Sequence, residues 1–360
     1  MSLAWDVPYP PRNLSEINAL MKVWYKHCDA ALDSPIMAGH TLQFIGVPTF
    51  DFLPSSLYNV TCASYLGQPL APVNDMTSDA YHHGPRREYF ETLRLDSQSM
   101  PDFKVVLTEP LSTGRGKYSQ VWKAEAIGAE GDALPVVVKL FQGSLFPEPK
   151  MIGQKLDPET LMQEEVSHRE AWAYERLRPA QGTIVPYSYG FYNVKLPCND
   201  VVCAHIMEYI QGTSLGTYAA TYGGHENQEE TEKVMTTMTK VAYALHVLGV
   251  AHCDWSWRNI RVSPHGRVVI FDFGMAMNVE DPSENTLPPL VMDGRLLWAC
   301  FYYVAIPRQV ARWSVKMQED PTVLWARPMR DVDRLSYDEW ITPNYTWADR
   351  VRGEIIRSEH

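Results

Sequence analysis

Three polar residues in a fixed order constrain this chain more than any other feature. The stretch HCDWSWRNIRVSPHGRVVIFDFG, residues 252–274, places Asp254 in HCD, Asn259 five residues later, and Asp272 directly after the apolar run VVIF. The runs IRV and VVIF can pair as two strands around a turn at His265-Gly266, which would bring Asn259 close to Asp272. Two carboxylates and an amide in this order suit phosphoryl transfer, in which a protein mainly positions phosphate groups and neutralises their charge through Mg²⁺.

Each of the three residues has an expected role in that chemistry. Asp272 and Asn259 would supply oxygen ligands to Mg²⁺, which prefers hard oxygen donors. Asp254 would orient the attacking hydroxyl group and accept its proton. The tripeptide DFG alone is a common way for a strand to enter a turn, so the prediction depends on a matching set of residues upstream.

A glycine-containing turn lies upstream, between two of three expected strands. The runs FKVVLTEPL, YSQVWKAEAI and LPVVVKLF, within residues 103–141, predict consecutive antiparallel strands. Gly114 and Gly116 fall in the first turn, STGRGK. Because glycine has no Cβ, backbone N–H groups there can approach phosphate oxygens, although a GxG turn alone is more often an ordinary hairpin.

A lysine and a glutamate complete the upstream set. Lys139 lies near the end of the third strand, where a cation can hold the α and β phosphates of a nucleotide. The next segment predicts a helix of about 20 residues, with Asp157 as N-cap and Pro158 at its first position. Glu170 lies in line with the apolar stripe of this helix. A carboxylate that faces a core is costly unless it is paired, so we expect Glu170 to pair with Lys139.

Taken together, these motifs resemble the protein kinase superfamily. GRGKYSQV, VVVK, the helix with Glu170, HIMEYIQGTSL, HCDWSWRN and DFG correspond in order to its glycine loop, β3 lysine, αC glutamate, hinge, catalytic loop and magnesium loop. The resemblance covers about residues 103–305 and is greatest to the divergent protein-kinase-like proteins common in fungi. It implies ATP and Mg²⁺ as cofactors and a hydroxyl-bearing substrate.

The resemblance also implies residues for the adenine site. Met207 would be the gatekeeper, and Glu208 and Tyr209 would form the hinge that offers backbone groups to adenine. Val121, just after the glycine loop, would contact the nucleotide as well. Asp293 in MDGRLLW is a weak match to the aspartate that opens the central helix of the C-lobe.

Several positions depart from the family pattern. Ser119 replaces the third loop glycine, Cys253 the arginine of HRD, and Ser256 the lysine that follows the catalytic aspartate. Val137 stands where alanine usually covers adenine, and Arg261 where an apolar residue usually forms the floor of that site. No APE motif follows DFG. Ser256, Val137 and Arg261 favour a pseudokinase that serves as a binding or scaffold module, whereas the intact motif residues Lys139, Glu170, Asp254, Asn259 and Asp272 oppose it. HxD with a small residue at its second position also resembles small-molecule kinases of the aminoglycoside and choline kinase type.

Composition restricts the partners and the compartment. The formal net charge is −11, without a run of Lys and Arg that could follow a phosphate backbone, so we expect no nucleic-acid partner. The longest apolar run, LLWACFYYVAI at 296–306, is too short to span a bilayer and is expected to be a buried helix. Six cysteines without CxxC pairs, and no leader-like start, favour the reducing cytoplasm or nucleus.

The expected architecture is an α+β, bilobal protein-kinase-like fold. Residues 1–100 would form an N-terminal extension containing a helix at SEINALMKVWYKHC, and residues 101–360 the kinase-like domain. Its N-lobe, about 101–209, would hold an antiparallel sheet and the αC helix. Its C-lobe, about 210–360, would be helical and shortened, with a long helix at TEKVMTTMTKVAYALHVLG that ends at Gly249.

Overall fold

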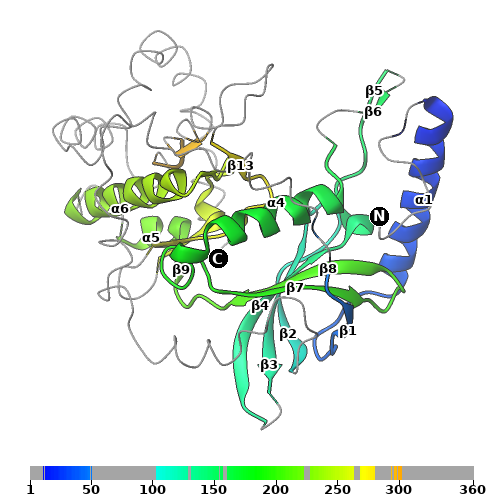
Figure 1. Ribbon diagram of the computed structural model, residues 1–360, viewed down its shortest axis with the longest axis horizontal. Helices are drawn as coiled ribbons and strands as arrows, with labels where there is room; N and C mark the ends of the chain where they lie inside the picture. The colour runs from blue at the N-terminus through cyan, green and yellow to red at the C-terminus, as the bar shows by residue number, and fades with distance from the viewer. Residues whose placement is uncertain are drawn as a thin grey trace. The chain divides into compact units, whose positions relative to one another are not determined.

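The computed structural model forms two compact units, which we describe separately (Figure 1). Unit 1 comprises residues 1–52, 84–172 and 187–209, and unit 2 comprises residues 53–83, 173–186 and 210–360. The structure describes the following residues: 11, 13–48, 50, 103–128, 131–153, 155–156, 160–222, 228–262, 268–279, 293, 296–297 and 299–301. The predicted His265-Gly266 turn and the predicted C-lobe after residue 301 lie outside these ranges.

A six-stranded sheet dominates unit 1, in the order β1-β7-β8-β4-β3-β2 with every neighbouring pair antiparallel. The strands are β1 (Gln43–Gly46), β2 (Lys104–Ser112), β3 (Gln120–Ile127), β4 (Ala133–Phe141), β7 (Ser188–Lys195) and β8 (Val201–Glu208). The three predicted antiparallel strands and the helix after them are confirmed. The antiparallel-sheet N-lobe of a kinase-like fold is therefore present.

The segment that carries β1 contacts both edges of this sheet. β1 pairs with β7, while Gly39 and Leu42 donate backbone hydrogen bonds to Leu107 and Val105 of β2. Backbone hydrogen bonds thus link this segment to both β7 and β2, so neither of these strands is left with an unpaired edge that would favour aggregation. The division at residue 100 stays a prediction, but part of the segment before it folds with the sheet.

Alternating side chains divide the sheet into two faces. Even-numbered residues of β4 and β8, such as Val138 and Ile206, belong to the main apolar core of unit 1, together with Trp122 of β3. Odd-numbered residues point to the opposite face, since successive strand residues alternate. Phe141 and Cys203 on that face pack with Val166 of the helix α4 (Gln163–Arg176).

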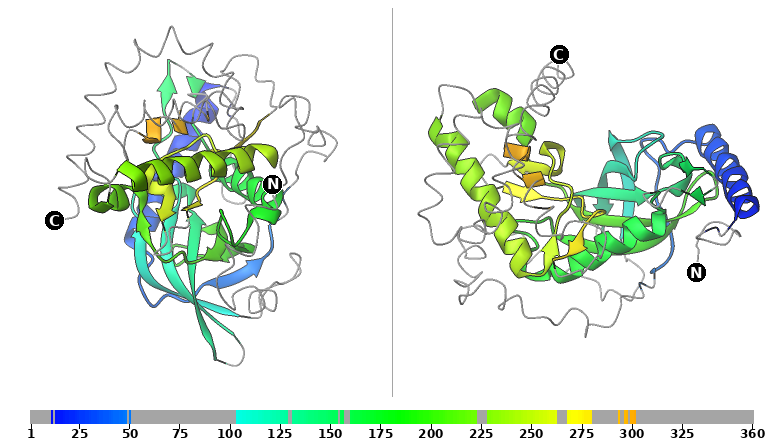
Figure 2. Two further views of the ribbon diagram at one scale, coloured as in Figure 1. Left: turned by 90° about the vertical axis from the view of Figure 1, so that its left-hand side faces the viewer. Right: turned by 90° about the horizontal axis from the view of Figure 1, so that it is seen from above.

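The expected N-terminal helix is confirmed as α1 (Leu14–Asp33), with Asn13 as its N-cap. It lies beside the sheet in the views of Figures 1 and 2. Trp24 of α1 is almost fully buried and donates from Nε1 to the carbonyl of Gly143, at 3.3 Å. Gly143 begins the short 3-10 helix η4 (Gly143–Leu145), so α1 supports the segment after β4.

The start of α4 corrects the sequence prediction. Asp157 and Pro158 lie outside the described residues, but Thr160 to Met162 are not helical, so the prediction that the helix begins at Pro158 was wrong. The preceding chain instead forms a small hairpin of β5 (Met151–Ile152) and β6 (Lys155–Leu156). The Glu165 carboxylate accepts from the backbone N–H of Met162 at 3.0 Å, which satisfies a donor at the true helix start.

The described part of unit 2 contains helices and short strands. The helices are α5 (Leu215–Tyr222), α6 (Gln228–Val247) and the 3-10 helices η5 (Arg178–Ala180) and η6 (Trp257–Asn259). A three-stranded sheet has the order β12-β11-β9, with β9 (Thr213–Ser214), β11 (Ile260–Val262) and β12 (Val268–Ile270). β10 (Val250–Ala251) pairs with β13 (Met277–Asn278). The predicted long helix that ends at Gly249, and the predicted pairing of IRV with VVIF, are both confirmed.

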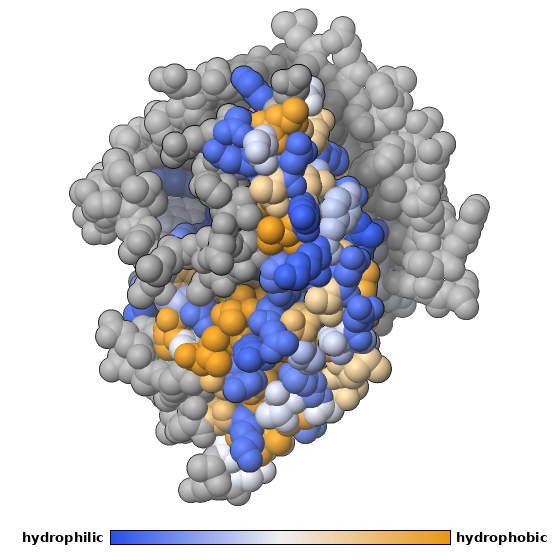
Figure 3. Space-filling model, turned by 90° about the vertical axis from the view of Figure 1, so that its right-hand side faces the viewer, coloured by the Kyte–Doolittle hydropathy of each residue, from blue (hydrophilic) through white to orange (hydrophobic). Residues whose placement is uncertain are grey.

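The described surface carries scattered apolar side chains. Large exposed ones include Leu14, Tyr25 and Leu32 of α1, and Met37 in the loop that follows. Figure 3 faces the side of the molecule where α1 lies and shows hydrophobic patches mixed with hydrophilic residues. Among the described helices, none has the length and apolar character needed to cross a membrane.

Candidate active site

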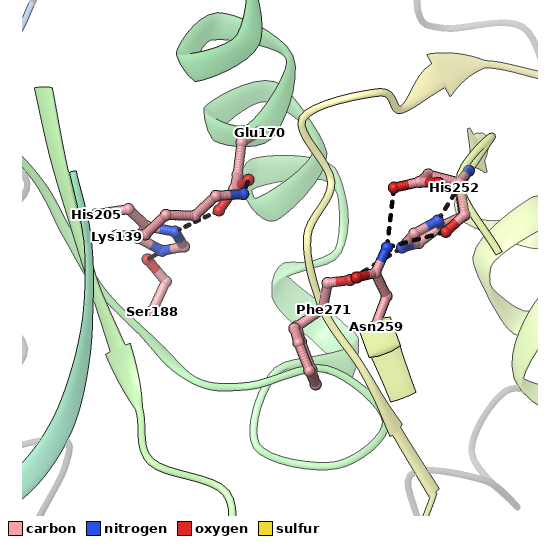
Figure 4. A network of polar contacts seen from close by, with 8 residues as sticks. Lys139, Glu170, Ser188, His205, His252, Asn259 and Phe271 are labelled. Carbon is pink, nitrogen blue, oxygen red and sulfur yellow. Dashed lines mark hydrogen bonds and ion pairs between the residues drawn. The ribbon is translucent and has the colours of Figure 1, made fainter. Parts of the chain in front are cut away.

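A buried ion pair joins β4 to α4 in unit 1. Lys139 Nζ bonds Oε2 of Glu170, and the two side chains are 5% and 0% exposed (Figure 4). The prediction that Glu170 faces inward and pairs with Lys139 is confirmed. Removing one partner would leave an uncompensated buried charge and would destabilise the fold strongly. Compared with two apolar side chains of the same size, however, the ion pair adds little to the free energy of unfolding.

A histidine that the sequence analysis did not single out binds the same carboxylate. His205 of β8 is fully buried, and its Nδ1 lies 2.9 Å from Oε1 of Glu170. Its Nε2 lies 2.9 Å from Oγ of Ser188. Burial lowers the pKa of His205 below its ordinary value and outweighs the hydrogen bond and charge of Glu170, which raise it. The ring is therefore neutral near pH 7.

The glycine turn has positive backbone angles but does not present the N–H groups of its glycines to a ligand. Gly114 and Gly116 have φ of 111° and 81°, which glycine adopts without strain. The N–H of Gly114 donates to the side chain of Gln120 at 2.6 Å, and that of Gly116 donates to the carbonyl of Leu145 at 2.8 Å. For these groups to hold phosphate oxygens, as predicted, both bonds must open.

The residues expected around adenine share one face of the sheet. Val121 is paired in register with Lys139, and Val137 with Met207, so these four side chains point to the same side as the ion pair. The backbone N–H of Glu208 donates to the carbonyl of Tyr187 at 2.8 Å, which engages one of the backbone groups expected to serve the hinge.

The last hinge residue, Tyr209, contacts a neighbouring strand. Lys123 Nζ of β3 lies 4.8 Å from the centre of the Tyr209 ring. This cation–π contact connects the end of the predicted hinge to the sheet.

The predicted catalytic loop forms a compact hydrogen-bonded group in unit 2. Asn259 Nδ2 donates to the backbone carbonyl of Asp254 at 3.0 Å and to its Oδ2 at 2.9 Å. The nitrogen of this amide therefore faces Asp254, and its oxygen faces another direction. Asp254 and Asn259 are therefore in direct contact, which the sequence analysis did not predict.

His252 connects this loop to the strand that precedes Asp272. Its Nδ1 accepts from the N–H of Asp254 at 3.2 Å, so the Nε2–H donates to the carbonyl of Phe271 at 3.1 Å (Figure 4). The N–H of Phe271 donates to the carbonyl of Asn259 at 3.0 Å. Asn259 and Asp272 thus lie on adjoining chain segments. His252 is fully buried with its ring 4.8 Å from that of Phe273, so its role is structural.

Asp272 has an unusual backbone conformation. Its φ of 69° lies in the left-handed region, which non-glycine residues seldom adopt. The next residue, Phe273, is fully buried between His252 and Tyr174, whose ring centre is 5.5 Å away. Burial of Phe273 supports this backbone conformation of Asp272, since such conformations persist where the surrounding structure holds them.

Asp293 holds the catalytic loop through hydrogen bonds to its residues. Its Oδ1 accepts from the N–H of Cys253 at 2.6 Å and from Trp255 Nε1 at 2.8 Å, and its Oδ2 bonds His246 Nε2 at 2.6 Å. Burial alone would raise the pKa of Asp293, but the hydrogen bonds from His246 and Trp255 and the charges of His246 and His252 bring it below its ordinary value. The hydrogen bond from the Cys253 N–H helps to hold Cys253 in the left-handed backbone conformation, at a φ of 57°. Asp293, a weak match in the sequence, is thus a central structural residue.

Two of the residues that depart from the family pattern, Ser256 and Arg261, make local contacts in the structure. Ser256 caps η6 by accepting from the N–H of Arg258 at 3.3 Å. The Arg258 guanidinium lies 4.8 Å from the centre of the Trp257 ring, which holds it against its neighbour. Arg261 Nη1 reaches the carbonyl of Gly212 at 3.5 Å.

The chain's donor set fits Mg²⁺ that is bound mainly through a nucleotide. Among the described residues no group of three or more His, Cys, Asp or Glu is placed to hold a metal ion. Mg²⁺ commonly uses only one or two protein oxygens together with water and substrate phosphates. Asp272 and Asn259 offer such a pair, one carboxylate and one amide oxygen.

Comparison with known proteins identifies the class to which this fold and these motifs belong. Residues 112–294, just over half of the 360 residues, match the protein kinase domain. The chain belongs to the protein kinase family.

Individual relatives match shorter stretches. The chain is 28% identical over 121 residues to mitogen-activated protein kinase kinase kinase 17 of Arabidopsis thaliana. The aligned stretch covers 33% of this chain and 32% of that protein. It is 33% identical over 92 residues to mitogen-activated protein kinase kinase kinase YODA of the same plant, covering 26% of this chain and 10% of that protein. The chain thus spans a third or less of the length of these relatives. They are plant proteins, so the likeness to fungal kinase-like proteins stays a prediction.

Proposed function

We propose that this protein is an ATP- and Mg²⁺-dependent phosphotransferase that moves the γ-phosphoryl group of ATP to a hydroxyl group, with a protein as the acceptor. The observation that carries the proposal is the buried pair of Lys139 and Glu170. A buried ion pair is a poor source of stability compared with apolar side chains of the same size, so its presence favours a functional reason. The relatives are by name kinases of mitogen-activated protein kinase kinases, which supports a protein acceptor.

In this proposal unit 1 binds and orients the nucleotide. Lys139 supplies positive charge to the α and β phosphates, and Glu170 keeps its ammonium group in one position. Val121, Val137 and Met207 give the apolar surface for adenine, while the hinge after β8 offers backbone groups. Gly114 and Gly116 must exchange their present partners, Gln120 and Leu145, for phosphate oxygens.

The residues of unit 2 act on the acceptor and the transferred group. Asp254 accepts the proton of the attacking hydroxyl, and its carboxylate is oriented by Asn259 Nδ2. Asp272 and the Asn259 oxygen would hold Mg²⁺, which supplies charge neutralisation of the phosphates when bound. His252 keeps the two chain segments together and does not exchange protons with substrate.

A pseudokinase is the second candidate, and specific contacts favour it. The N–H groups of Gly114 and Gly116 are already hydrogen-bonded within the chain. Ser256 serves as a helix cap where the resemblance expects a lysine that holds the γ-phosphate, and Arg261 stands where the resemblance expects an apolar residue. A small-molecule kinase is the remaining alternative, and a substrate screen would separate it from a protein kinase.

A thermal-shift measurement tests the proposal. A ligand that binds only the folded protein raises its melting temperature, by an amount that grows with ligand concentration. We expect ATP with Mg²⁺ to raise the melting temperature of the wild type, and Asp272→Asn to lose the magnesium-dependent part. An unchanged melting temperature at millimolar ATP would refute the ATP-dependent function.

We also infer a reducing compartment, the cytoplasm or the nucleus. The five described cysteines are free thiols, and all of them except Cys198 are buried. This is the state expected where glutathione and thioredoxin keep thiols reduced.

A further inference from the structure

His205 is placed on the functional face of the sheet. It pairs in register with Lys139 of β4, so both side chains project to the side where Glu170 of α4 lies. The ring of Phe191 stacks on His205 with centroids 4.0 Å apart and an interplanar angle of 9°. Figure 4 shows Lys139 and His205 approaching the same carboxylate. The plane of the imidazole is therefore fixed.

The hydrogen bonds around His205 assign its tautomer. The ionised Glu170 carboxylate can only accept hydrogen bonds, so the contact with Nδ1 of His205 needs a hydrogen on Nδ1, while Nε2 lies 2.9 Å from Oγ of Ser188. Nε2 then accepts, and Nδ1 carries the hydrogen that it donates to Glu170 Oε1 at 2.9 Å. With a neutral imidazole, the buried group of Lys139, Glu170 and His205 has no net charge.

The two oxygens of Glu170 are thus held by different partners. Oε2 binds Lys139 and Oε1 binds His205. The last torsion of a glutamate side chain is broad, so a carboxylate with a single partner can rotate about it. A second, charge-assisted hydrogen bond removes that freedom.

We propose that His205 is a positioning residue for Lys139: it fixes the Glu170 carboxylate, which in turn holds the ammonium group where the phosphates of ATP bind. The inference rests on the proposed function and extends it to a residue for which the kinase resemblance gave no role. His205 contacts neither the nucleotide nor the acceptor. It acts through Glu170 alone.

Two substitutions of nearly equal size separate positioning from packing. His205→Asn can keep an amide N–H near the place of Nδ1, whereas His205→Leu has no donor. Ile206→Ala is the matched control for stability, because Ile206 is fully buried in the main core on the opposite face of β8. All three are compared with the wild type by melting temperature, by KM for ATP with Mg²⁺, and by kcat.

We expect His205→Leu to lower kcat/KM for ATP by about tenfold or more, because a hydrogen bond to a buried carboxylate is lost. His205→Asn should recover most of this loss, to within about threefold of the wild type. Ile206→Ala should lower the melting temperature and leave KM unchanged. Equal kinetic losses in His205→Leu and His205→Asn, with an active wild type, would overturn the inference and leave the proposed function intact.

A second readout does not depend on turnover. Long-range ¹H–¹⁵N NMR correlations of the full chain report which nitrogen of His205 carries the proton. The inference requires a neutral ring protonated at Nδ1, and a ring protonated at Nε2 would overturn it. If the wild type binds ATP without turnover, the proposed function is refuted. The role of His205 is then tested by the dissociation constants for ATP of the same variants, which should follow the order expected for kcat/KM.

Discussion

Removing the two partners of the buried ion pair, singly and together, gives the most informative stability experiment. In Glu170→Gln, the Lys139 ammonium remains in a site where the side chain is only 5% exposed, without its counter-charge. Breaking a buried pair in this way costs roughly 3–5 kcal/mol of unfolding free energy. In Lys139→Met, Glu170 keeps the hydrogen bond from His205, so the cost should fall at or below the lower end of that range.

The double variant Lys139→Met/Glu170→Gln should be more stable than Glu170→Gln. It contains no unpaired buried charge, and replacing both partners of a buried pair is often neutral. Urea unfolding followed by tryptophan fluorescence measures the effect, since Trp24 and Trp122 are buried in unit 1. We expect a coupling energy of at least about 2 kcal/mol between the two sites.

The control for this cycle lies on the same helix. Glu175 forms an exposed pair with Arg178, in which the side chains are 56% and 54% exposed, so Glu175→Gln should cost less than about 1 kcal/mol. Additive losses at positions 139 and 170, or single losses as small as that of the control, would refute the account of a coupled buried pair.

Three further predictions concern stability. The pKa of Asp293 is lowered in the folded state, so its contribution to the free energy of unfolding is fully present above about pH 4 and is lost as the pH falls through the folded-state pKa. Asp293→Asn should therefore destabilise the protein at pH 7 and make its melting temperature depend less on pH in the acid range. An unchanged acid dependence would contradict this role of Asp293. Deletion of residues 1–47 removes β1, the partner of β7, and the segment bonded to β2, so it should cause aggregation that is visible as early elution in size-exclusion chromatography; unchanged elution and stability would refute this role. Trp24→Ala should lower the free energy of unfolding by about 3–5 kcal/mol. Because Trp24 supports η4, whose Leu145 carbonyl accepts from the Gly116 N–H, the variant should also accelerate hydrogen exchange at the Gly116 amide. Unchanged exchange would show that α1 does not support the glycine loop.

The sequence predicted those parts of the candidate site that follow a local period. Glu170 could be placed on the inner face of its helix from its spacing to Val166 and Tyr174, and Lys139 from its place near the end of an apolar strand. Asp254 and Asn259 could be placed in one loop because they lie five residues apart, although their direct contact was not predicted. These local patterns account for most of the confirmed predictions.

Long-range pairing explains what the sequence analysis missed. β1 is only four residues long and pairs with Lys195 and its neighbours, about 150 residues further along the chain, which no local pattern reveals. His205 resembled an ordinary strand residue, although its register with Lys139 could have indicated a shared face. The engaged N–H groups of Gly114 and Gly116 depend on Gln120 and Leu145, whose positions follow only from the folded loop.

The start of α4 was misplaced for a related reason. A proline preceded by an aspartate is a common helix start, and it outweighed the weaker signals of the β5-β6 hairpin just before it. The true start is set by Glu165 and the Met162 N–H, which resemble any other acid and amide in the sequence. Helix ends depend on such single hydrogen bonds.

The central claim is that this chain transfers the γ-phosphoryl group of ATP with Asp254 as the proton acceptor. It is tested most directly by single-turnover transfer from [γ-³²P]ATP to a mixed protein substrate, with the wild type and Asp254→Asn in parallel. The account predicts labelled acceptor with the wild type and a rate lower by about 10²–10⁴ for Asp254→Asn, because one proton acceptor is lost. Equal rates for the two proteins, or no labelling by a wild type that binds ATP, would contradict it.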